Sequence, residues 1–413
     1  MENDVLLKLK NSESNRAQAA NDRGLTGADG LRAIACLSVM THHFTQRINI
    51  NSQPPVIRDV SCFFLLGNVG VSIFFVLSGF LLSYPFWRQY LNEGNFPNIK
   101  QYAIRRAARI MPGYYLAFIV SLLLVIILQT PTEAIVIRSI AGLAFTSGFH
   151  YVTFFPNQLN SPFWSISFEV FCYFLMPLFM YGLFKIFGTN RSFLKSILYW
   201  IGVLGIIIGL NQLIHIYLEP DNVNRGWQYG PIGGAKYWMP NYNPIGFFGH
   251  FTMGIFAAGA SVRLFMKADK LEKFKKVNGF DMIGLSCFLC SIVMLWFMRY
   301  APDFSLSLQN QPYYFPIYTI LIAAALAVAP NSNWFGRILD NRFFRYTAKV
   351  SFGLYLWHYL IISLTCINIY FDNLLVWGGV SIAITVLSYI IATLSYKYVE
   401  KPVLDRVHRK YAR

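Results

Sequence analysis

The feature that most constrains the fold is a series of apolar runs, each about 20 residues long, which is the length of helix that crosses the roughly 30 Å core of a bilayer. Only 13% of the 413 residues are charged, whereas a soluble domain carries about 25%. We therefore predict an all-α, polytopic integral membrane protein. Soluble classes such as Rossmann dehydrogenases and barrel hydrolases are excluded.

These runs predict about ten transmembrane spans. Their approximate limits are 29–47, 67–87, 111–130, 163–184, 196–218, 245–265, 281–300, 313–330, 350–370 and 374–396. A further apolar stretch at 131–150 is short and is interrupted by Pro131, Glu133 and Arg138. The basic residues indicate whether that stretch crosses.

With ten spans and the N-terminus inside, 29 of the 35 Lys and Arg residues lie in cytoplasmic segments, as the positive-inside rule expects. Counting 131–150 as a crossing would move most of the later basic groups outside. We therefore interpret it as re-entrant or outward-facing, and we predict that both termini are cytoplasmic. The same rule accounts for the net charge of +16, so no nucleic-acid partner is expected.

Three parts follow from this topology: a cytoplasmic N-terminal tail (1–27), a ten-helix transmembrane domain (28–397) and a basic cytoplasmic C-terminal tail (398–413). Residues 1–27 lack the apolar core of a signal peptide. The pair Cys287-x-x-Cys290 has no matching second pair or His cluster, so no metal site is expected. The sequence does not indicate an oligomeric state.

The first span places an arginine and a histidine on one face. Arg32 and His43 are 11 residues apart, which brings both side chains to nearly the same side of a helix, about 16 Å apart along its axis. Ionisable residues inside spans are costly and often functional, and a neutral imidazole can act as a general base. A structural histidine and an arginine reaching the interface remain an alternative. Asp29 is expected to pair with Arg32.

The fourth span runs inward and carries Glu169 about 9 Å below the outer surface, close to the depth predicted for His43. We expect Glu169 to orient His43 or to hold an acceptor hydroxyl, with a structural hydrogen bond to Ser or Tyr as the alternative. Trp164 and Ser165, at the outer start of this span, are candidates for an acceptor-side pocket.

A basic cluster precedes the third span. Arg106 and Arg109 are neighbours on one helix face, and Arg105 adjoins them. Guanidinium groups bind phosphates in a bidentate way, so a nucleotide head group is a suitable ligand. Anchoring to anionic lipid is the alternative, and without other evidence it is the better one.

The ninth span repeats polar residues at i, i+4 and i+7, namely Ser351, Tyr355 and His358. This spacing lines one helix face and fits either a cavity wall or hydrogen bonds between helices. In the second span, Gly79 permits close approach of a helix or a ligand.

The longest outer loop, about 219–244, is rich in aromatic residues. They form either an interfacial belt or a surface on which sugar rings stack, and they are Trp227, Tyr229, Tyr237, Trp238 and Tyr242.

Taken together, the motifs resemble those of the integral-membrane acyltransferase family three, bacterial proteins that use cytoplasmic acyl-CoA to acylate extracytoplasmic glycans and similar acceptors. The matching segments occur in the family's order: Asp29–Arg32 with His43, Phe74–Phe80, Arg105–Pro112, Trp164–Glu169, Ser351–His358 and Tyr398–Pro402. Some relatives continue into an extracytoplasmic hydrolase-like domain. This chain stops 17 residues after its last predicted span, so transfer is expected to be completed by the membrane domain or by a separate partner.

The resemblance implies that His43 is catalytic, with Glu169 in the same pocket. It further implies that acyl-CoA is bound by Arg32, Arg105, Arg106, Arg109, Ser351, Tyr355 and His358. The expected activity is transfer of an acyl group, most simply acetyl, to a hydroxyl of a carbohydrate or lipid-linked glycan such as O-antigen, capsule or exopolysaccharide. The expected location is the bacterial inner membrane, and no permanently bound cofactor is needed.

Two other classes fit the same residues less well. A proton-coupled transporter would use the polar stripe as a solute path, but the inverted repeats common in transporters are not visible in the sequence. A membrane scaffold would leave His43 and Glu169 without a role.

Overall fold

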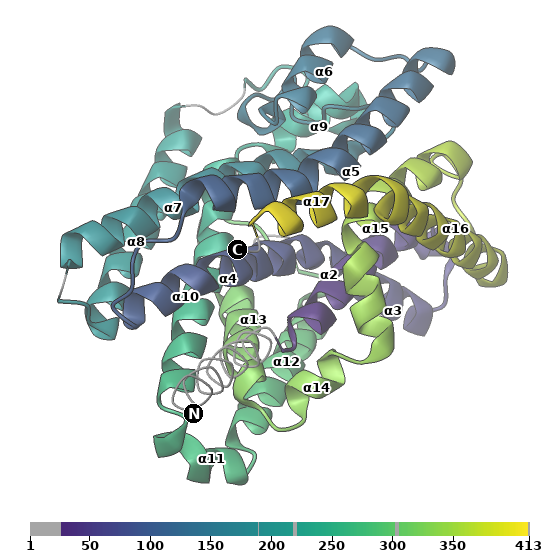
Figure 1. Ribbon diagram of the computed structural model, residues 1–413. Helices are drawn as coiled ribbons and strands as arrows, with labels where there is room; N and C mark the ends of the chain where they lie inside the picture. The colour runs from purple at the N-terminus through teal and green to yellow at the C-terminus, as the bar shows by residue number, and fades with distance from the viewer. Residues whose placement is uncertain (1–25, 189, 218–220, 302–304, 412–413) are drawn as a thin grey trace.

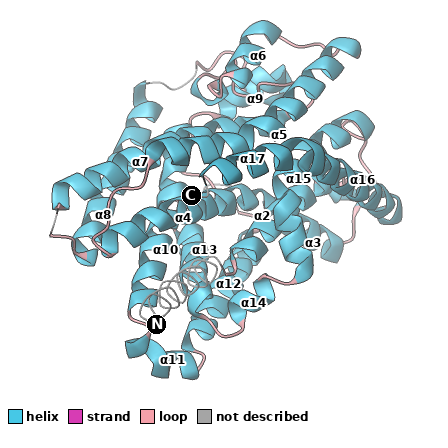
Figure 2. Ribbon diagram, in the orientation of Figure 1, coloured by secondary structure: helices cyan, strands magenta, loops and turns pink. Residues whose placement is uncertain are grey.

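The computed structural model describes residues 26–188, 190–217, 221–301 and 305–411. Over these ranges the chain forms helices and loops and no β-strand, as Figure 2 shows, which confirms the all-α class. The predicted tail at 1–27 lies outside them except for its last two residues. The α-helices are α2 (Ala28–Thr45), α3 (Pro55–Leu65), α4 (Gly70–Leu91), α5 (Ile99–Ile127), α6 (Ile135–Leu143), α7 (Trp164–Phe187), α8 (Phe193–Tyr217), α9 (Gly230–Trp238), α10 (Pro244–Met266), α11 (Glu272–Lys276), α12 (Gly279–Met298), α13 (Ile317–Val328), α14 (Phe335–Leu339), α15 (Arg342–Thr365), α16 (Leu374–Ser395) and α17 (Lys401–Tyr411).

Each of the ten predicted spans contains a helix, and seven helical segments of the described chain are long and apolar enough to cross a membrane. These seven are Pro55–Leu91, Ile99–Ile127, Ser161–Phe187, Phe193–Ile216, Pro244–Met266, Gly279–Met298 and Leu374–Tyr411. Large apolar side chains are exposed along α5, α8 and α12. Exposed apolar surface on this scale marks contact with lipid or another partner, and it supports a multi-pass membrane protein.

The other three predicted spans coincide with α2, α13 and α15. The helix α13 has only 12 residues, while α2 and α15 carry ionisable side chains. Both polar helices are largely buried, because they pack on each other and α2 also packs on α4. Ionisable residues in membrane spans face a bundle interior or a cavity, which is the arrangement found here. The count of ten spans stays a prediction.

The stretch at 131–150 contains a short helix that is held against its neighbour. With nine residues, α6 is about 14 Å long and cannot cross a core of roughly 30 Å. The hydroxyls of Tyr114 and Tyr115 on α5 donate to the carbonyls of Gly142 and Leu143 at 2.9 and 3.1 Å. This agrees with the interpretation of 131–150 as a segment that does not cross.

Helices α4 and α10 make the most extensive contact between two helices of the described chain. A Cβ atom added to Gly79 would lie 2.0 Å from the carbonyl oxygen of Phe251, and one added to Gly254 would lie 1.9 Å from that of Val76. Small residues that let two backbones meet are a general device of membrane helix packing. The prediction that Gly79 permits close helix approach is therefore confirmed.

The C-terminal segment is an ordered helix that packs on the bundle. A π-helical turn, Tyr396–Glu400, joins α16 to α17 without a break. Figure 1 shows α17 following the course of α5, and the two helices are in contact. The region predicted as a tail at 398–413 is thus part of the helical bundle as far as Tyr411.

We expect Gly79→Ala to lower stability by about 1–3 kcal/mol, the usual cost of forcing extra volume into a packed contact. The matched control is Gly209→Ala on α8, where an added Cβ meets nothing within 4 Å. There the loss of backbone freedom in the unfolded state should make alanine neutral or stabilising. Thermal unfolding in detergent measures both. Equal midpoints for the two variants would contradict the close α4–α10 contact.

Candidate functional site

A cavity of about 520 Å³ lies among α2, α4, α5, α7, α15 and α17. It brings together eight of the predicted site residues, which come from four of these helices: Arg32, Arg105, Arg106, Arg109, Ser165, Glu169, Ser351 and Tyr355. The other three, His43, Trp164 and His358, are not among the described residues that line it. Four arginines and two carboxylates, those of Asp29 and Glu169, give the cavity an excess of positive charge.

The N-terminus of α2, which carries Arg32, is fixed from α14. The carboxylate of Asp340 accepts hydrogen bonds from the backbone amides of Gly27 and Gly30 at 2.8 and 3.4 Å. Gly30 is so close to Leu339 that an added Cβ would lie 2.1 Å from its carbonyl oxygen. A carboxylate at a helix N-terminus accepts hydrogen bonds from amides that have no partner within the helix, and its negative charge interacts favourably with the positive end of the helix dipole. The start of α2 is thereby set relative to the cavity.

The arginines divide into two kinds. Arg109 forms an ion pair at 3.7 Å with Glu400, which is 1% exposed, and Arg105 donates to the backbone carbonyl of Tyr411 at 3.0 Å. By contrast, Nε of Arg106 is buried with no hydrogen-bond partner among the described residues. The expected pair of Asp29 with Arg32 is not formed, because both side chains line the cavity instead. Arg32 and Arg106 are thus the guanidinium groups open to a ligand.

Glu169 is bound on the cavity wall by two hydroxyls. Ser78 on α4 donates to Oε1 of Glu169 at 2.9 Å, and Tyr173, one turn further along α7, donates to the same oxygen. Of the roles expected for Glu169, the structural hydrogen bond to Ser or Tyr is therefore present, whereas no contact with His43 is found among the described residues. In the structure Glu169 lies with the arginines, because equal depth in a membrane does not imply the same side of a helix.

Two of the residues that line the cavity, Tyr355 and Ser165, are joined by a short hydrogen bond. The hydroxyls of Tyr355 and Ser165 are 2.6 Å apart, and the Tyr355 hydroxyl also reaches the carbonyl oxygen of Pro162 at 3.1 Å. These contacts join α15 to the start of α7. Ser165, predicted as an acceptor-side residue, therefore lines the arginine cavity.

Close to Tyr355, His43 pairs with His358. Nδ1 of His43 is 2.9 Å from Nε2 of His358, the two rings are stacked, and Tyr359 packs edge-on against His43. His358 is fully buried, and its Nδ1 is 2.8 Å from the carbonyl oxygen of Leu354. Along α15, His358 is three residues from Tyr355, a step of about 4.5 Å. His358 therefore lies less than one helical turn from a residue that lines the cavity, and the rings of Tyr355 and His358 are 6.0 Å apart between centroids.

Trp164 belongs to an aromatic cluster beneath the long loop that contains α9, which is predicted to lie outside. It is 5% exposed and meets Trp238, Tyr242 and Phe247 edge to face. The loop's other aromatic residues are about half exposed; they are Trp227, Tyr229 and Tyr237. The loop thus holds one buried group that packs on α7 and one group that faces outward.

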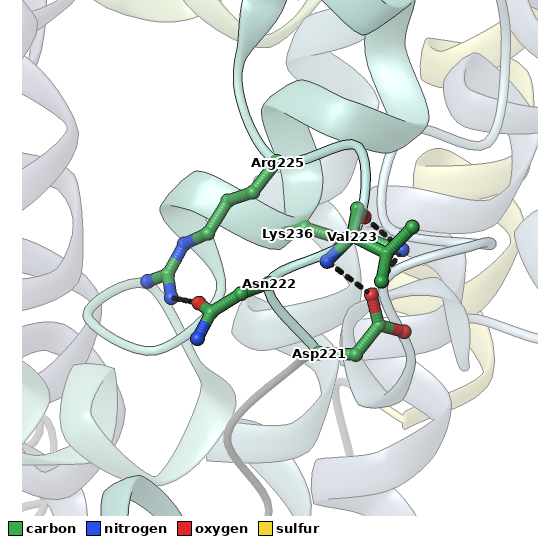
Figure 3. A network of polar contacts seen from close by, with 5 residues as sticks. All are labelled: Asp221, Asn222, Val223, Arg225 and Lys236. Carbon is green, nitrogen blue, oxygen red and sulfur yellow. Dashed lines mark hydrogen bonds and ion pairs between the residues drawn. The ribbon is translucent and has the colours of Figure 1, made fainter.

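A polar network fixes the loop beside this cluster (Figure 3). Nζ of Lys236 donates to Oδ1 of Asp221 at 2.6 Å and to the carbonyl oxygen of Val223 at 2.7 Å, while Arg225 donates to Asn222 at 3.0 Å. The hydrogen bond from Lys236 lowers the pKa of the Asp221 carboxyl below its ordinary value. The carboxylate is therefore retained well into the acid range, and with it the contact that orders the loop.

The lining residues that were not predicted as site residues include Ser78, Tyr173, Leu404 and His408. Two sequence signals pointed to three of them. Tyr173 is four residues from Glu169, on the same helix face. Leu404 and His408 are also four residues apart, in the segment predicted as a tail. The helix face that they share is the one that α17 turns toward the cavity.

Comparison with known proteins identifies the family. Residues 25–393 match the acyltransferase domain family. The chain belongs to this family. The resemblance drawn from the motifs is confirmed, and no solved structure matches the chain significantly.

Several curated relatives are about 25% identical. A putative peptidoglycan O-acetyltransferase of Bacillus subtilis (strain 168), YrhL, matches over 402 residues, 95% of this chain and 56% of the relative. The peptidoglycan O-acetyltransferase OatA of Listeria monocytogenes matches over 394 residues, 91% and 55%. A putative O-acetyltransferase of Staphylococcus aureus (strain COL) matches over 397 residues, 92% and 57%. The chain thus spans slightly more than half the length of these relatives.

We expect the cap on α2 to be sensitive to pH. Burial raises the pKa of the Asp340 carboxyl, with Asp29 adding to the effect. A carboxyl whose pKa is higher in the folded state favours folding at low pH, and this contribution is lost as the pH rises through the folded-state pKa. Asp340→Asn keeps an acceptor and removes the charge. The thermal midpoint of the variant minus that of the wild type should therefore increase as the pH rises.

Asp340→Ala serves as the contrasting variant, since it removes the acceptor and should cost about 0.5–2 kcal/mol. Both variants are compared with the wild type by thermal unfolding between acid and neutral pH. A midpoint difference between wild type and Asp340→Asn that does not change with pH would argue against a buried carboxylate at the α2 cap.

Proposed function

We propose that this protein transfers an acetyl group from cytoplasmic acetyl-CoA, or another acyl-CoA, to a hydroxyl of an extracytoplasmic carbohydrate. The observation that carries the proposal is the position of the arginine cavity, because Tyr355 in its lining lies less than one helical turn from His358, which pairs with His43. Membership of the acyltransferase domain family supports the acyl transfer. The family assignment also leaves the transporter alternative without support of its own.

The arginine cavity suits a phosphorylated donor. Arg32 and Arg106 line the cavity and form no ion pair with a carboxylate of the described residues, and guanidinium binds phosphate through paired, charge-assisted hydrogen bonds. A cavity of about 520 Å³ is within the usual range for small-molecule sites, roughly 300–1,000 Å³. In this proposal the phosphates of CoA bind at the arginines, and the thioester points toward Tyr355 and the histidine pair.

His43 is the proposed catalytic residue. Its imidazole removes the proton from the acceptor hydroxyl, and the oxygen attacks the thioester carbonyl. The C–S bond then breaks, and the CoA thiolate takes the proton from His43, so that the ester and free CoA thiol are the products. The thioester is already an activated acyl donor, so no cofactor is required in this scheme.

The acceptor would approach from the side of the long outer loop. Trp164 and its aromatic cluster form the base of that loop, and the half-exposed rings of Trp227, Tyr229 and Tyr237 offer faces on which a sugar can pack. The names of the relatives favour peptidoglycan as the acceptor over O-antigen, capsule or exopolysaccharide. The proposed location is the cytoplasmic membrane of a bacterium, with both termini inside.

Arg106→Gln should weaken binding of acetyl-CoA about 10- to 100-fold, since a hydrogen bond to a charged group contributes about 1.5–3 kcal/mol. Isothermal titration with detergent-purified protein measures this. Lys276→Gln is the matched control, because that exposed lysine pairs with Glu272 away from the cavity. Arg109 is a poorer probe, since its removal leaves the buried Glu400 carboxylate unpaired. Folded wild-type protein that binds neither acetyl-CoA nor CoA would overturn the donor assignment.

His43→Gln should leave the affinity for acetyl-CoA unchanged and lower the rate of acetyl transfer by about 10²- to 10⁴-fold, the usual contribution of a positioned acid–base group. Before an acceptor is known, slow hydrolysis of bound acetyl-CoA serves as the assay. A His43→Gln variant that hydrolyses acetyl-CoA as fast as the wild type would remove His43 from the mechanism.

A further inference from the structure

His43 has two ring nitrogens, and only one of them can act as the base. In a neutral imidazole one nitrogen carries the proton and the other has the free lone pair, and the partner of the first nitrogen decides which is which. The hydrogen bonds of His43 and His358 therefore fix which nitrogen of each ring carries the proton.

The assignment starts at the carbonyl group of Leu354, because a carbonyl oxygen can only accept a hydrogen bond. Nδ1 of His358 lies 2.8 Å from this oxygen and must therefore carry a proton. His358 is fully buried, and the described structure gives it no carboxylate partner, so the neutral form is favoured there. A neutral ring protonated at Nδ1 has its lone pair at Nε2, which is the atom that faces His43.

The hydrogen bond between His43 and His358 can then have only one donor. Nδ1 of His43, 2.9 Å from the lone pair of His358, must be the donor. The lone pair of neutral His43 is consequently at Nε2. This atom has no hydrogen-bond partner among the described residues, and unlike Nε2 of His250 it is not among the fully buried unpartnered atoms. Nε2 of His43 is thus the one nitrogen of the pair that is open to a reactant.

The neighbouring His42 provides a contrast. Its Nδ1 contacts the carbonyl oxygen of Leu65, and its Nε2 is 3.1 Å from the side-chain nitrogen of Gln46. The carbonyl requires a proton on Nδ1, so Nε2 accepts from the amide of Gln46. Both nitrogens of His42 are occupied by the protein, and His42 is a structural residue.

We infer that His358 is the positioning residue of His43: it fixes the neutral tautomer with Nε2 as the basic atom, and it stabilises the imidazolium that forms when Nε2 takes a proton. This role differs from the acyl-CoA contact predicted for His358, and it rests on the proposed function. When Nε2 of His43 accepts the hydroxyl proton, the positive charge is shared with Nδ1–H, whose hydrogen bond to His358 then strengthens. Leu354 keeps the acceptor atom of His358 in place.

Two substitutions at residue 358 separate positioning from packing. His358→Gln retains an amide oxygen that can accept from Nδ1 of His43, whereas His358→Leu fills part of the space and cannot accept. His358→Leu should lower the transfer or hydrolysis rate about 10- to 100-fold, the usual effect of losing the group that orients a functional histidine. The affinity for acetyl-CoA should not change. His358→Gln should recover most of the rate.

The matched control is His250→Leu, which replaces another fully buried histidine, one paired with Ser72 rather than with a histidine. It should retain the catalytic rate once the fraction of folded protein is taken into account. Equal losses of rate in His250→Leu and His358→Leu would show that the loss reflects the removal of a buried histidine in general. That result would overturn the positioning role of His358.

The tautomer can be observed without any activity. In ¹⁵N-histidine-labelled protein in lipid vesicles, protonated and lone-pair nitrogens give separate NMR signals, and the His43→Gln spectrum identifies those of His43. The wild type should show a neutral His43 protonated at Nδ1, and this preference should be lost in His358→Leu. A His43 protonated at Nε2 in the wild type would overturn the inference even if acetyl-CoA binds. Conversely, if the protein has the expected tautomer but binds no acyl-CoA, the positioning role of His358 stands and the proposed function is wrong.

Discussion

The high cost of placing an ionisable group inside a membrane is the constraint on which this structure depends. The helices α2 and α15 carry arginine and histidine, and each buries its polar stripe against protein. The close contact of α4 with α10, made possible by Gly79 and Gly254, lets α4 form one wall of the cavity. The apolar helices that face outward surround this polar centre. Polar side chains from α2, α5, α7 and α15 thus meet around one cavity.

Within that centre, some arginines hold helices together and others face the cavity, where a ligand can reach them. Glu400, buried at the junction of α16 and α17, pairs with Arg109, and the carbonyl of Tyr411 accepts from Arg105. These two arginines attach the C-terminal helix to α5. Arg32 and Arg106 face the same cavity without such partners. Sequence spacing could not distinguish the two pairs, because the groups that occupy Arg105 and Arg109 are about 300 residues away in the chain.

The sequence predicted what depends on a single helix and missed what depends on the rotation of one helix against another. The all-α class and the shared face of Ser351 and Tyr355 follow from period and composition, and the structure has them. Glu169 was assigned to His43 by depth, but depth along the membrane normal leaves the direction of the side chain open. The contact between His43 and His358 depends on the parallel packing of α2 and α15, which also brings Cys36 to the backbone of Ser351, and no local pattern encodes that register.

The separation of the arginine cavity from the histidine pair has a consequence for the proposed reaction. The hydroxyls of Tyr355 and Ser165, which are hydrogen-bonded to each other, belong to the lining of the arginine cavity, whereas His43 and His358 do not. In the proposed reaction, a thioester whose phosphates are held by the arginines therefore has to extend past Tyr355 to reach Nε2 of His43. Two neutral hydroxyls form this contact, so an exchange of their hydrogen-bond partners as the acyl group passes would cost little.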